Sequence, residues 1–278
     1  MLDFLARVYI SCFAASYGVA LALELWHLIQ PRPILRYIAI GFGAAGALAH
    51  GAYLVGPATS GLSLVAPAGS LLLLALILSI SYVYGSIHHH RVAWGLFVLP
   101  LVLGLVVLAV VFPPPATSDS PGSLWDVFRG ERFWGTTHGV LVLLAAVGIS
   151  VGFVASVMYF VQAHRLKAKL APSPGMKMLS LERIDAMNRR AVLWSFPLLT
   201  AGLGVSMVML LAPGAGAWNW SDPKILSTLG LWLVFAVLLY LRYGVHVRGK
   251  QAALWTMIAF ILLIVALALP HPLLGGGP

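Results

Sequence analysis

The chain has 278 residues, of which 60% are apolar and only 9% are Asp, Glu, Lys or Arg, against about a quarter in soluble domains. Too few polar side chains are present to cover a water-facing globule, so the composition indicates an integral membrane protein. The single cysteine, Cys12, excludes an internal disulfide or a thiolate metal cluster. The net charge of +9 does not indicate nucleic-acid binding, because basic residues in a membrane protein first report its orientation.

Eight apolar runs follow one another along the chain, each suited to a helix that crosses the hydrocarbon layer. Such unbroken runs exclude the alternating pattern of transmembrane β-strands. The predicted fold is therefore an all-α integral membrane protein, with eight transmembrane helices in a single polytopic domain over residues 1–278. The predicted spans are Phe4–Leu28, Tyr37–Val55, Leu64–Tyr84, Val92–Phe112, Thr136–Gln162, Ala191–Leu211, Ile225–Tyr240 and Ala252–Leu269.

Most of the 17 Lys and Arg residues fall in alternate connections of this bundle. Short cytoplasmic loops retain such residues, so these connections are predicted to be cytoplasmic and both termini extracytoplasmic. The first span lacks the basic start and short apolar core of a cleaved signal peptide, so we expect it to be retained. The sequence thus predicts a multi-pass protein of the inner (cytoplasmic) membrane, with cytoplasmic connections at 29–36, 85–91, 163–190 and 241–251.

Two connections are longer than a turn requires. The outer one, 113–135, combines a proline-rich start with an amphipathic, aromatic-rich segment suited to the membrane interface. The inner one, 163–190, is basic, and contact with anionic membrane lipid is the favoured interpretation. Docking of a cytoplasmic protein on this loop is the alternative.

Histidines within spans indicate candidate sites, because an ionisable group is costly inside a membrane. His50 lies in the outer third of the second span, on one face with Gly43 and Ala47. Small residues at this spacing let helices approach closely, so His50 is predicted to face the bundle interior. His27, near the inner end of the first span, is instead predicted to pair with Glu24 on the same helix face.

Two more histidines lie at the same outer depth. His138 opens the fifth span on a stripe that continues through Ala145, Gly148 and Gly152, and it is predicted to face inward. His271 follows the last span at its outer end. The remaining histidines lie in inner loops, where ordinary solvated residues are the simpler interpretation: His88, His89, His90, His164 and His246.

A glycine-rich outer loop before the seventh span contains Trp218 and Trp220. Asp222 and Pro223 then form a typical helix start, an N-cap acceptor followed by a residue without an N–H group. The tryptophans could belong to the aromatic belt of the membrane interface. Beside inward-facing histidines, however, two indole faces suit a planar macrocycle whose iron takes axial imidazole ligands.

These segments resemble the CcsA/CcmC haem-handling family of cytochrome c assembly, most closely its shorter HemX-like, or CcsA-like, members. Residues 218–224, Trp-Asn-Trp-Ser-Asp-Pro-Lys, are similar to the family's tryptophan-rich WWD motif, and Thr137-His138-Gly139 falls where its first external histidine is expected. The resemblance is continuous from Trp134 to Leu269, and upstream it rests on hydropathy and on Leu48-Ala49-His50. Further similar segments are Ser195–Gly202, Leu231–Phe235 and Arg248–Ala253.

The resemblance implies a b-type haem held at the outer membrane face. His138 would be its first axial ligand, and His50 and His271 are the candidates for a second. The resemblance further implies that Trp218, Trp220 and Asp222 form the apolar surface and its edge. It also implies that the haem passes to a membrane or extracytoplasmic partner protein of cytochrome c assembly.

Departures from the family pattern favour a haem-handling or accessory role over complete cytochrome c synthase activity. The WWD-like segment is abbreviated, and Tyr240 stands about where full-length CcsA proteins carry a membrane histidine. One alternative is a HemX-like regulator of tetrapyrrole synthesis that acts through loop 163–190. Another is a small-solute transporter, which is disfavoured because the sequence shows no inverted repeat.

Overall fold

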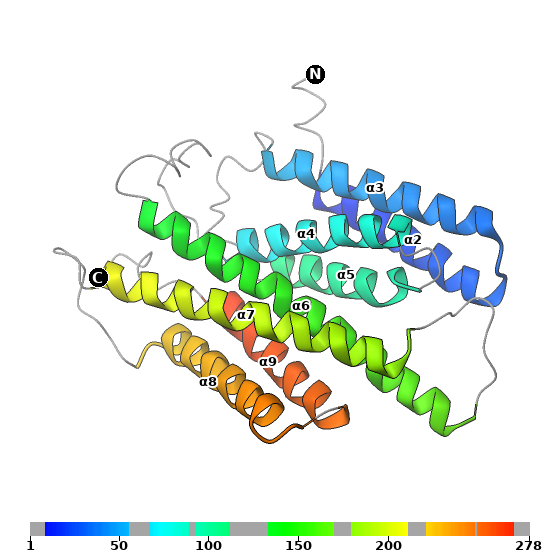
Figure 1. Ribbon diagram of the computed structural model, residues 1–278. Coiled ribbons are helices and arrows are strands. Elements are labelled where there is room, and N and C mark those ends of the chain that lie inside the picture. The colour runs from blue at the N-terminus through cyan, green and yellow to red at the C-terminus, as the bar shows by residue number, and fades with distance from the viewer. Residues whose placement is uncertain are drawn as a thin grey trace. The chain divides into compact units, whose positions relative to one another are not determined.

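The computed structural model describes residues 9–55, 67–88, 93–111, 133–169, 179–210, 221–247 and 249–269. All regular secondary structure in these ranges is α-helical, which confirms the predicted all-α class (Figure 1). Each helix coincides with one predicted span, in the predicted order. The helices are α2 (Ile10–Ile29), α3 (Pro33–Val55), α4 (Pro67–His88), α5 (Gly95–Val111), α6 (Phe133–Lys167), α7 (Leu181–Leu210), α8 (Pro223–Tyr243) and α9 (Lys250–Ala268).

Seven of the eight described helices are long and apolar enough to cross a membrane. The eighth, α5, is also apolar and has 17 residues. Lengths of this order match the thickness of the hydrocarbon layer, since a helix rises about 1.5 Å per residue. The chain is therefore a multi-pass membrane protein.

Helices α6 and α7 are longer than predicted, with 35 and 30 residues. Because α6 continues to Lys167 and α7 begins at Leu181, both ends of the predicted inner loop 163–190 are helical. The span predicted for α7 began only after the charged residues around Arg190. In the structure, the buried stripe of α7 extends before these charges, through Ile184 and Asn188. A helix needs only one buried face, so charged residues on its other face do not end it.

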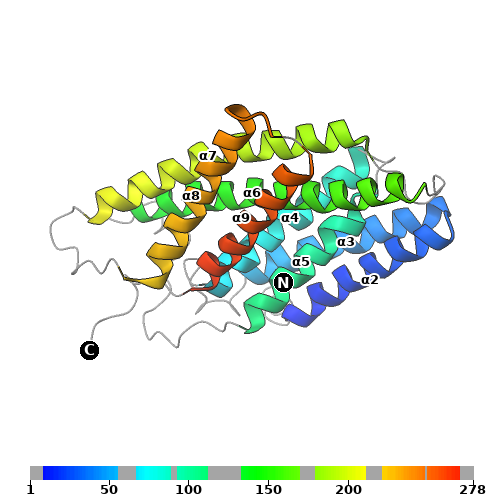
Figure 2. The same cartoon turned by 90° about the horizontal axis from the view of Figure 1, so that it is seen from below.

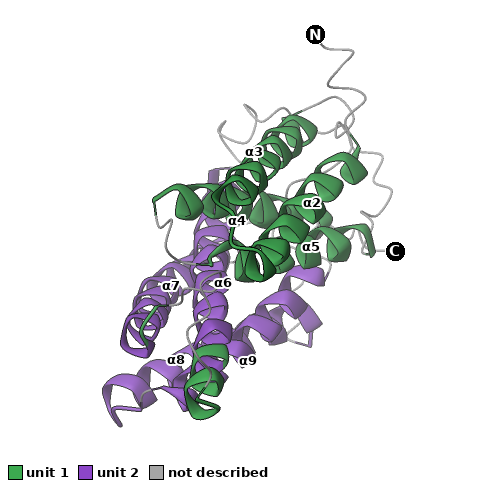
Figure 3. Cartoon of the chain, turned by 90° about the vertical axis from the view of Figure 1, so that its right-hand side faces the viewer, with its two compact units in different colours: residues 1–64, 68–120, 161–180 green, residues 65–67, 121–160, 181–278 purple. Residues whose placement is uncertain are grey.

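The described helices fall into two compact units, shown in different colours in Figure 3. Unit 1 contains α2 to α5 and the end of α6 from Val161. Unit 2 contains the rest of α6 together with α7, α8 and α9.

Tyr82 of α4 lies at the centre of unit 1. Helices α2 and α3 pack side by side there, and α2 also contacts α5 (Figures 1 and 2). The buried Tyr82 hydroxyl donates to Glu24 Oε1 at 3.1 Å. Its ring lies where a Cβ atom on Gly43 or Gly95 would collide with it, so both glycines permit a close approach. The predicted His27–Glu24 pair is confirmed only as an electrostatic interaction: Tyr82 supplies the hydrogen bond to Glu24, and His27 Nδ1 donates to the Arg32 carbonyl oxygen at 3.1 Å.

In unit 2, the inward stripe of α6 contacts α7. A Cβ atom on Gly148 would collide with the Ser195 hydroxyl, and one on Gly152 would lie 3.1 Å from Thr256 Cγ2. Ala145 and Gly152 are buried, so the predicted inward stripe is confirmed. Helices α8 and α9 lie side by side (Figures 1 and 2).

Candidate functional site

His138 lies in the second turn of α6 and forms a hydrogen bond with α7. Its Nδ1 atom is 2.8 Å from the carbonyl oxygen of Gly202. A carbonyl oxygen can only accept, so Nδ1 carries the proton and Nε2 carries the lone pair. A histidine that binds a metal through Nε2 usually donates its other ring N–H to such an oxygen, which fixes the tautomer and the ring orientation.

Gly202 allows this hydrogen bond because it lets α6 and α7 approach closely. A Cβ atom at this position would lie 3.0 Å from Val142 Cγ2 and 3.6 Å from the Val142 amide nitrogen. Val142 lies one helical turn after His138, on the same side of α6. The absence of a side chain at Gly202 thus brings its carbonyl oxygen within reach of the imidazole.

The start of α8 lies at the same end of unit 2. Asp222 caps the helix by accepting from the Lys224 amide at 2.8 Å, and Pro223 occupies the first turn, so the predicted helix start is confirmed. The Lys224 ammonium donates to the Leu269 carbonyl at the end of α9, at 2.9 Å. It also lies within electrostatic range of His138. These contacts join the start of α8 to the end of α9, with Lys224 within electrostatic range of His138.

Three of the predicted site residues, Trp218, Trp220 and His271, lie outside the described residues. Most of the predicted outer loop 113–135 is also outside them; its last three residues begin α6.

His50 belongs to unit 1, where it is fully buried. The Phe13 ring stacks on the imidazole with a centroid distance of 4.1 Å and an interplanar angle of 2°. The Tyr17 hydroxyl lies 3.3 Å from Nδ1, and Nε2 has no partner among the described residues. The prediction that His50 faces inward, on one face with Gly43, is confirmed.

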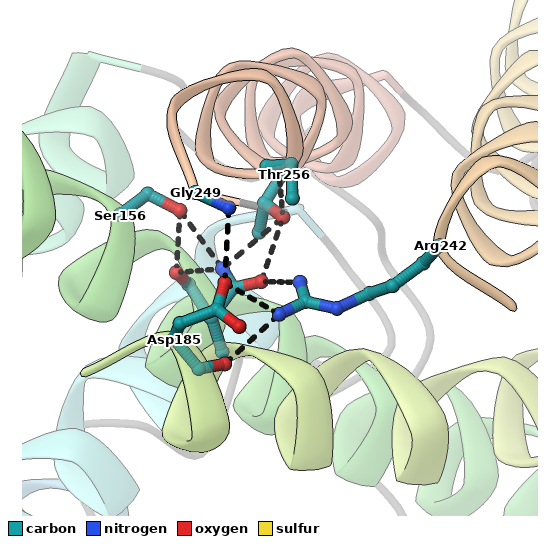
Figure 4. A network of polar contacts seen from close by, with 8 residues as sticks. Ser156, Asp185, Arg242, Gly249 and Thr256 are labelled. Atoms are coloured by element: carbon teal, nitrogen blue, oxygen red, sulfur yellow. Dashed lines mark hydrogen bonds and ion pairs between the residues drawn. The ribbon is translucent and has the colours of Figure 1, made fainter. Parts of the chain in front are cut away.

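Sequence reasoning missed a buried polar network at the opposite end of unit 2, centred on Arg242 (Figure 4). The Arg242 side chain extends from α8 and forms a 2.7 Å ion pair with Asp185 of α7. It also donates to Asn188 Oδ1 at 2.6 Å. The sequence analysis placed Arg242 in the inner connection 241–251, but it lies in the last turn of α8 with only 5% of its surface exposed.

Asn188 connects this ion pair to the other two helices. Its amide nitrogen donates to the Gly152 carbonyl at 3.0 Å and to the Ser156 hydroxyl at 2.9 Å, both on α6. The same amide is 3.2 Å from the Thr256 hydroxyl on α9 (Figure 4). The sequence did contain one signal of this network. The spacing of Asp185 and Asn188 places two polar side chains on one helix face.

The model of the family described as "Cytochrome C assembly protein" matches residues 64–269. The chain belongs to this family. The predicted resemblance is confirmed, and the match begins well before Trp134, in apolar helices where no motif residue marked the family. His138, Trp218, Trp220 and Asp222 lie within the matched residues, whereas His50 and His271 lie outside them.

Similar proteins in this family include two named Protein HemX. That of Bacillus subtilis (strain 168) is 27% identical over 128 residues, 46% of this chain and 46% of that protein. That of Brevibacillus brevis is 24% identical over 171 residues, 60% of each chain. The cytochrome c biogenesis protein CcsA of Hordeum vulgare is 31% identical over 115 residues, 40% of this chain and 35% of that protein.

The chain thus covers less than two thirds of the length of each of these relatives. No solved structure matches.

Proposed function

We propose that this chain holds haem b at the outer face of the cytoplasmic membrane and passes it to a partner protein of cytochrome c assembly. Membership of the cytochrome c assembly family supports a place in this process. The observation that carries the proposal is the 2.8 Å hydrogen bond between His138 Nδ1 and the Gly202 carbonyl.

The chemistry of His138 fits an axial ligand of haem iron. Haem iron takes neutral imidazole nitrogen as a ligand, and the Gly202 carbonyl holds the ring in the tautomer that presents Nε2 as that nitrogen. The same hydrogen bond increases the basicity of the ligand and restricts rotation of the ring. When bound, the haem supplies the iron, while the protein supplies orientation and access.

Chain connectivity supports a role in haem binding for residues just before the start of α8 and just after the end of α9. Trp220 precedes Asp222 by two residues, and His271 follows Leu269 by two residues. Two residues span about 7 Å at most. Because Lys224 bonds to Leu269, both segments are tethered to one end of unit 2. In this proposal Trp218 and Trp220 form the apolar surface for the macrocycle and Asp222 lies at its edge.

The second axial ligand stays a choice between His50 and His271. The buried Nε2 of His50 has no partner among the described residues. His271 follows Leu269, the acceptor of the Lys224 ammonium, by two residues in the sequence. Replacing each in turn with alanine tests the choice, because loss of one of two axial imidazoles changes the absorption spectrum of bound haem.

The proposed topology has eight membrane spans, both termini outside and the 163–190 connection in the cytoplasm. The Lys and Arg residues around that connection support this orientation. Alkaline phosphatase fused after residue 117 is expected to be active, and the same enzyme fused after residue 175 is expected to be inactive. The reverse pattern would contradict the topology.

Absorption spectroscopy of the purified protein tests haem binding directly. The pyridine haemochrome of the wild type is expected to show b-type haem. His138→Gly is expected to lose the haem, and added imidazole is expected to restore it by occupying the ligand position. His164→Gly, at an exposed position on the same helix, is the control and should retain haem. A wild-type protein that binds no haem when haem is supplied would refute the proposal.

A further inference from the structure

Lys224 is a half-buried cation at the start of α8. An ammonium group has three hydrogens to donate, and removing it from water is costly unless it is paired. Among the described residues, the acceptor for its side chain is the neutral carbonyl of Leu269. An ion pair between described residues joins Arg242 to Asp185, at the other end of unit 2.

The nearby carboxylate of Asp222 does not replace an ion-pair partner for Lys224. Its Oδ1 atom accepts from the backbone amide of Lys224, so it serves as the N-cap of α8. The N-terminal end of α8 adds a partial positive charge at the same place, because its peptide dipoles are aligned. The surroundings of the Lys224 ammonium therefore favour an additional anionic group.

His138 relates this cation to the proposed haem site. The Lys224 ammonium lies within electrostatic range of the His138 imidazole, which itself is anchored on α7. A haem carries two propionate carboxylates on one edge of its ring and iron at its centre. A ligand for the iron on α6 and a cation on α8 match these two features.

We propose that the Lys224 ammonium pairs with the propionate carboxylates of the haem at the His138 site. This inference rests on the proposed function and extends it by assigning a residue to the anionic edge of the ligand. The ion pair adds an anionic partner in direct contact, whereas Asp222 interacts with the Lys224 ammonium electrostatically, without an ion pair among the described residues. It also determines which edge of the asymmetric macrocycle faces α8, since His138 alone leaves rotation about the iron–nitrogen bond open.

The test compares two forms of the ligand on the full-length protein, purified without haem in detergent. Iron protoporphyrin IX has free propionates, whereas its dimethyl ester has none. Wild type is expected to bind the free acid about tenfold or more tightly than the ester, because a hydrogen bond to a charged group is lost in the ester. In Lys224→Gln the two affinities are expected to be about equal. Glutamine retains a donor for the Leu269 carbonyl, so the variant removes the charge and keeps the structural contact.

Two further variants complete the experiment. Lys224→Arg restores a cation and should restore the preference for the free acid. Lys250→Gln removes an exposed lysine at the start of α9, at the other end of unit 2, and should keep the preference unchanged. The inference is overturned if wild type binds both forms equally, or if Lys224→Gln keeps the full preference. If wild type binds neither form, the proposed function itself fails and this inference fails with it.

Discussion

His138 and Gly202 are 64 positions apart in the chain, yet His138 Nδ1 lies 2.8 Å from the Gly202 carbonyl oxygen. The contact depends on helix packing, because it requires α6 and α7 to approach closely at a residue without a side chain. Packing therefore determines the tautomer of the imidazole, and this tautomer presents Nε2 as the basic nitrogen.

Replacing Gly202 with alanine tests this dependence. The added Cβ would lie 3.0 Å from Val142 Cγ2, so α6 and α7 must separate slightly and the His138 hydrogen bond should lengthen. We expect a loss of about 1–3 kcal/mol in the free energy of unfolding, as for overpacked cores, together with weaker haem retention. Gly204→Ala is the matched control, since a Cβ atom there meets nothing within 4 Å. Equal unfolding and haem content in the two variants would contradict the packing argument.

Removing Arg242 should strongly destabilise unit 2. Arg242→Met leaves the Asp185 carboxylate without its charge partner and removes one donor to the Asn188 carbonyl, and breaking a buried ion pair in this way costs about 3–5 kcal/mol. The free energy of unfolding in detergent micelles measures the effect.

Two comparisons make the Arg242 prediction specific. Arg190→Met, at an exposed position on α7, should change the free energy by no more than about 0.5 kcal/mol. The double variant Arg242→Met, Asp185→Leu should be more stable than the sum of the single changes predicts, because no charge remains unpaired. Strict additivity would show that the two side chains do not act as a pair.

Gly249 should tolerate no side chain, for two separable reasons. Its φ angle is +68°, which is unfavourable for other residues by about 1–3 kcal/mol, and an added Cβ would lie 2.5 Å from the Tyr159 hydroxyl. Gly249→Ala should therefore unfold more easily than wild type. Adding Tyr159→Phe to Gly249→Ala should recover only the steric part, so the double variant should melt between the two. Full recovery would show that the backbone conformation contributes nothing.

Unit 1 depends on a similar close approach at Gly43. A Cβ atom at this position would collide with the Tyr82 ring, and that ring must stay in place for its hydroxyl to satisfy the buried Glu24. Gly43→Ala is expected to cost about 1–3 kcal/mol. Gly41→Ala, two residues earlier with open space around it, should melt like wild type. Thermal unfolding followed by intrinsic fluorescence compares the two variants, and equal melting temperatures would refute the prediction.

Much of the fold follows from local sequence rules. The sequence correctly predicted the described helices and the helix start at Asp222. It also correctly predicted that His50 and the stripe of α6 face inward. The predictions were incomplete or wrong where a distant residue competed with a local one. Glu24 was paired with its helix neighbour His27, which interacts with it electrostatically, but Tyr82, 58 positions away, supplies the hydrogen bond. Arg242 was assigned to a loop because charges commonly end a span, whereas Asp185 and Asn188 allow it to remain buried in α8.

The amino-acid sequence alone determined that this protein is a multi-pass helical membrane protein of the cytochrome c assembly family. Apolar length and motif residues are properties of short segments, and they persist whatever the helices contact. Only the tertiary structure identified the Gly202 carbonyl as the partner of His138, Leu269 as that of Lys224, and Asp185 as that of Arg242. These pairings depend on which helix faces pack against each other. Small residues that are far apart in the chain determine this packing, because they allow two helices to approach closely.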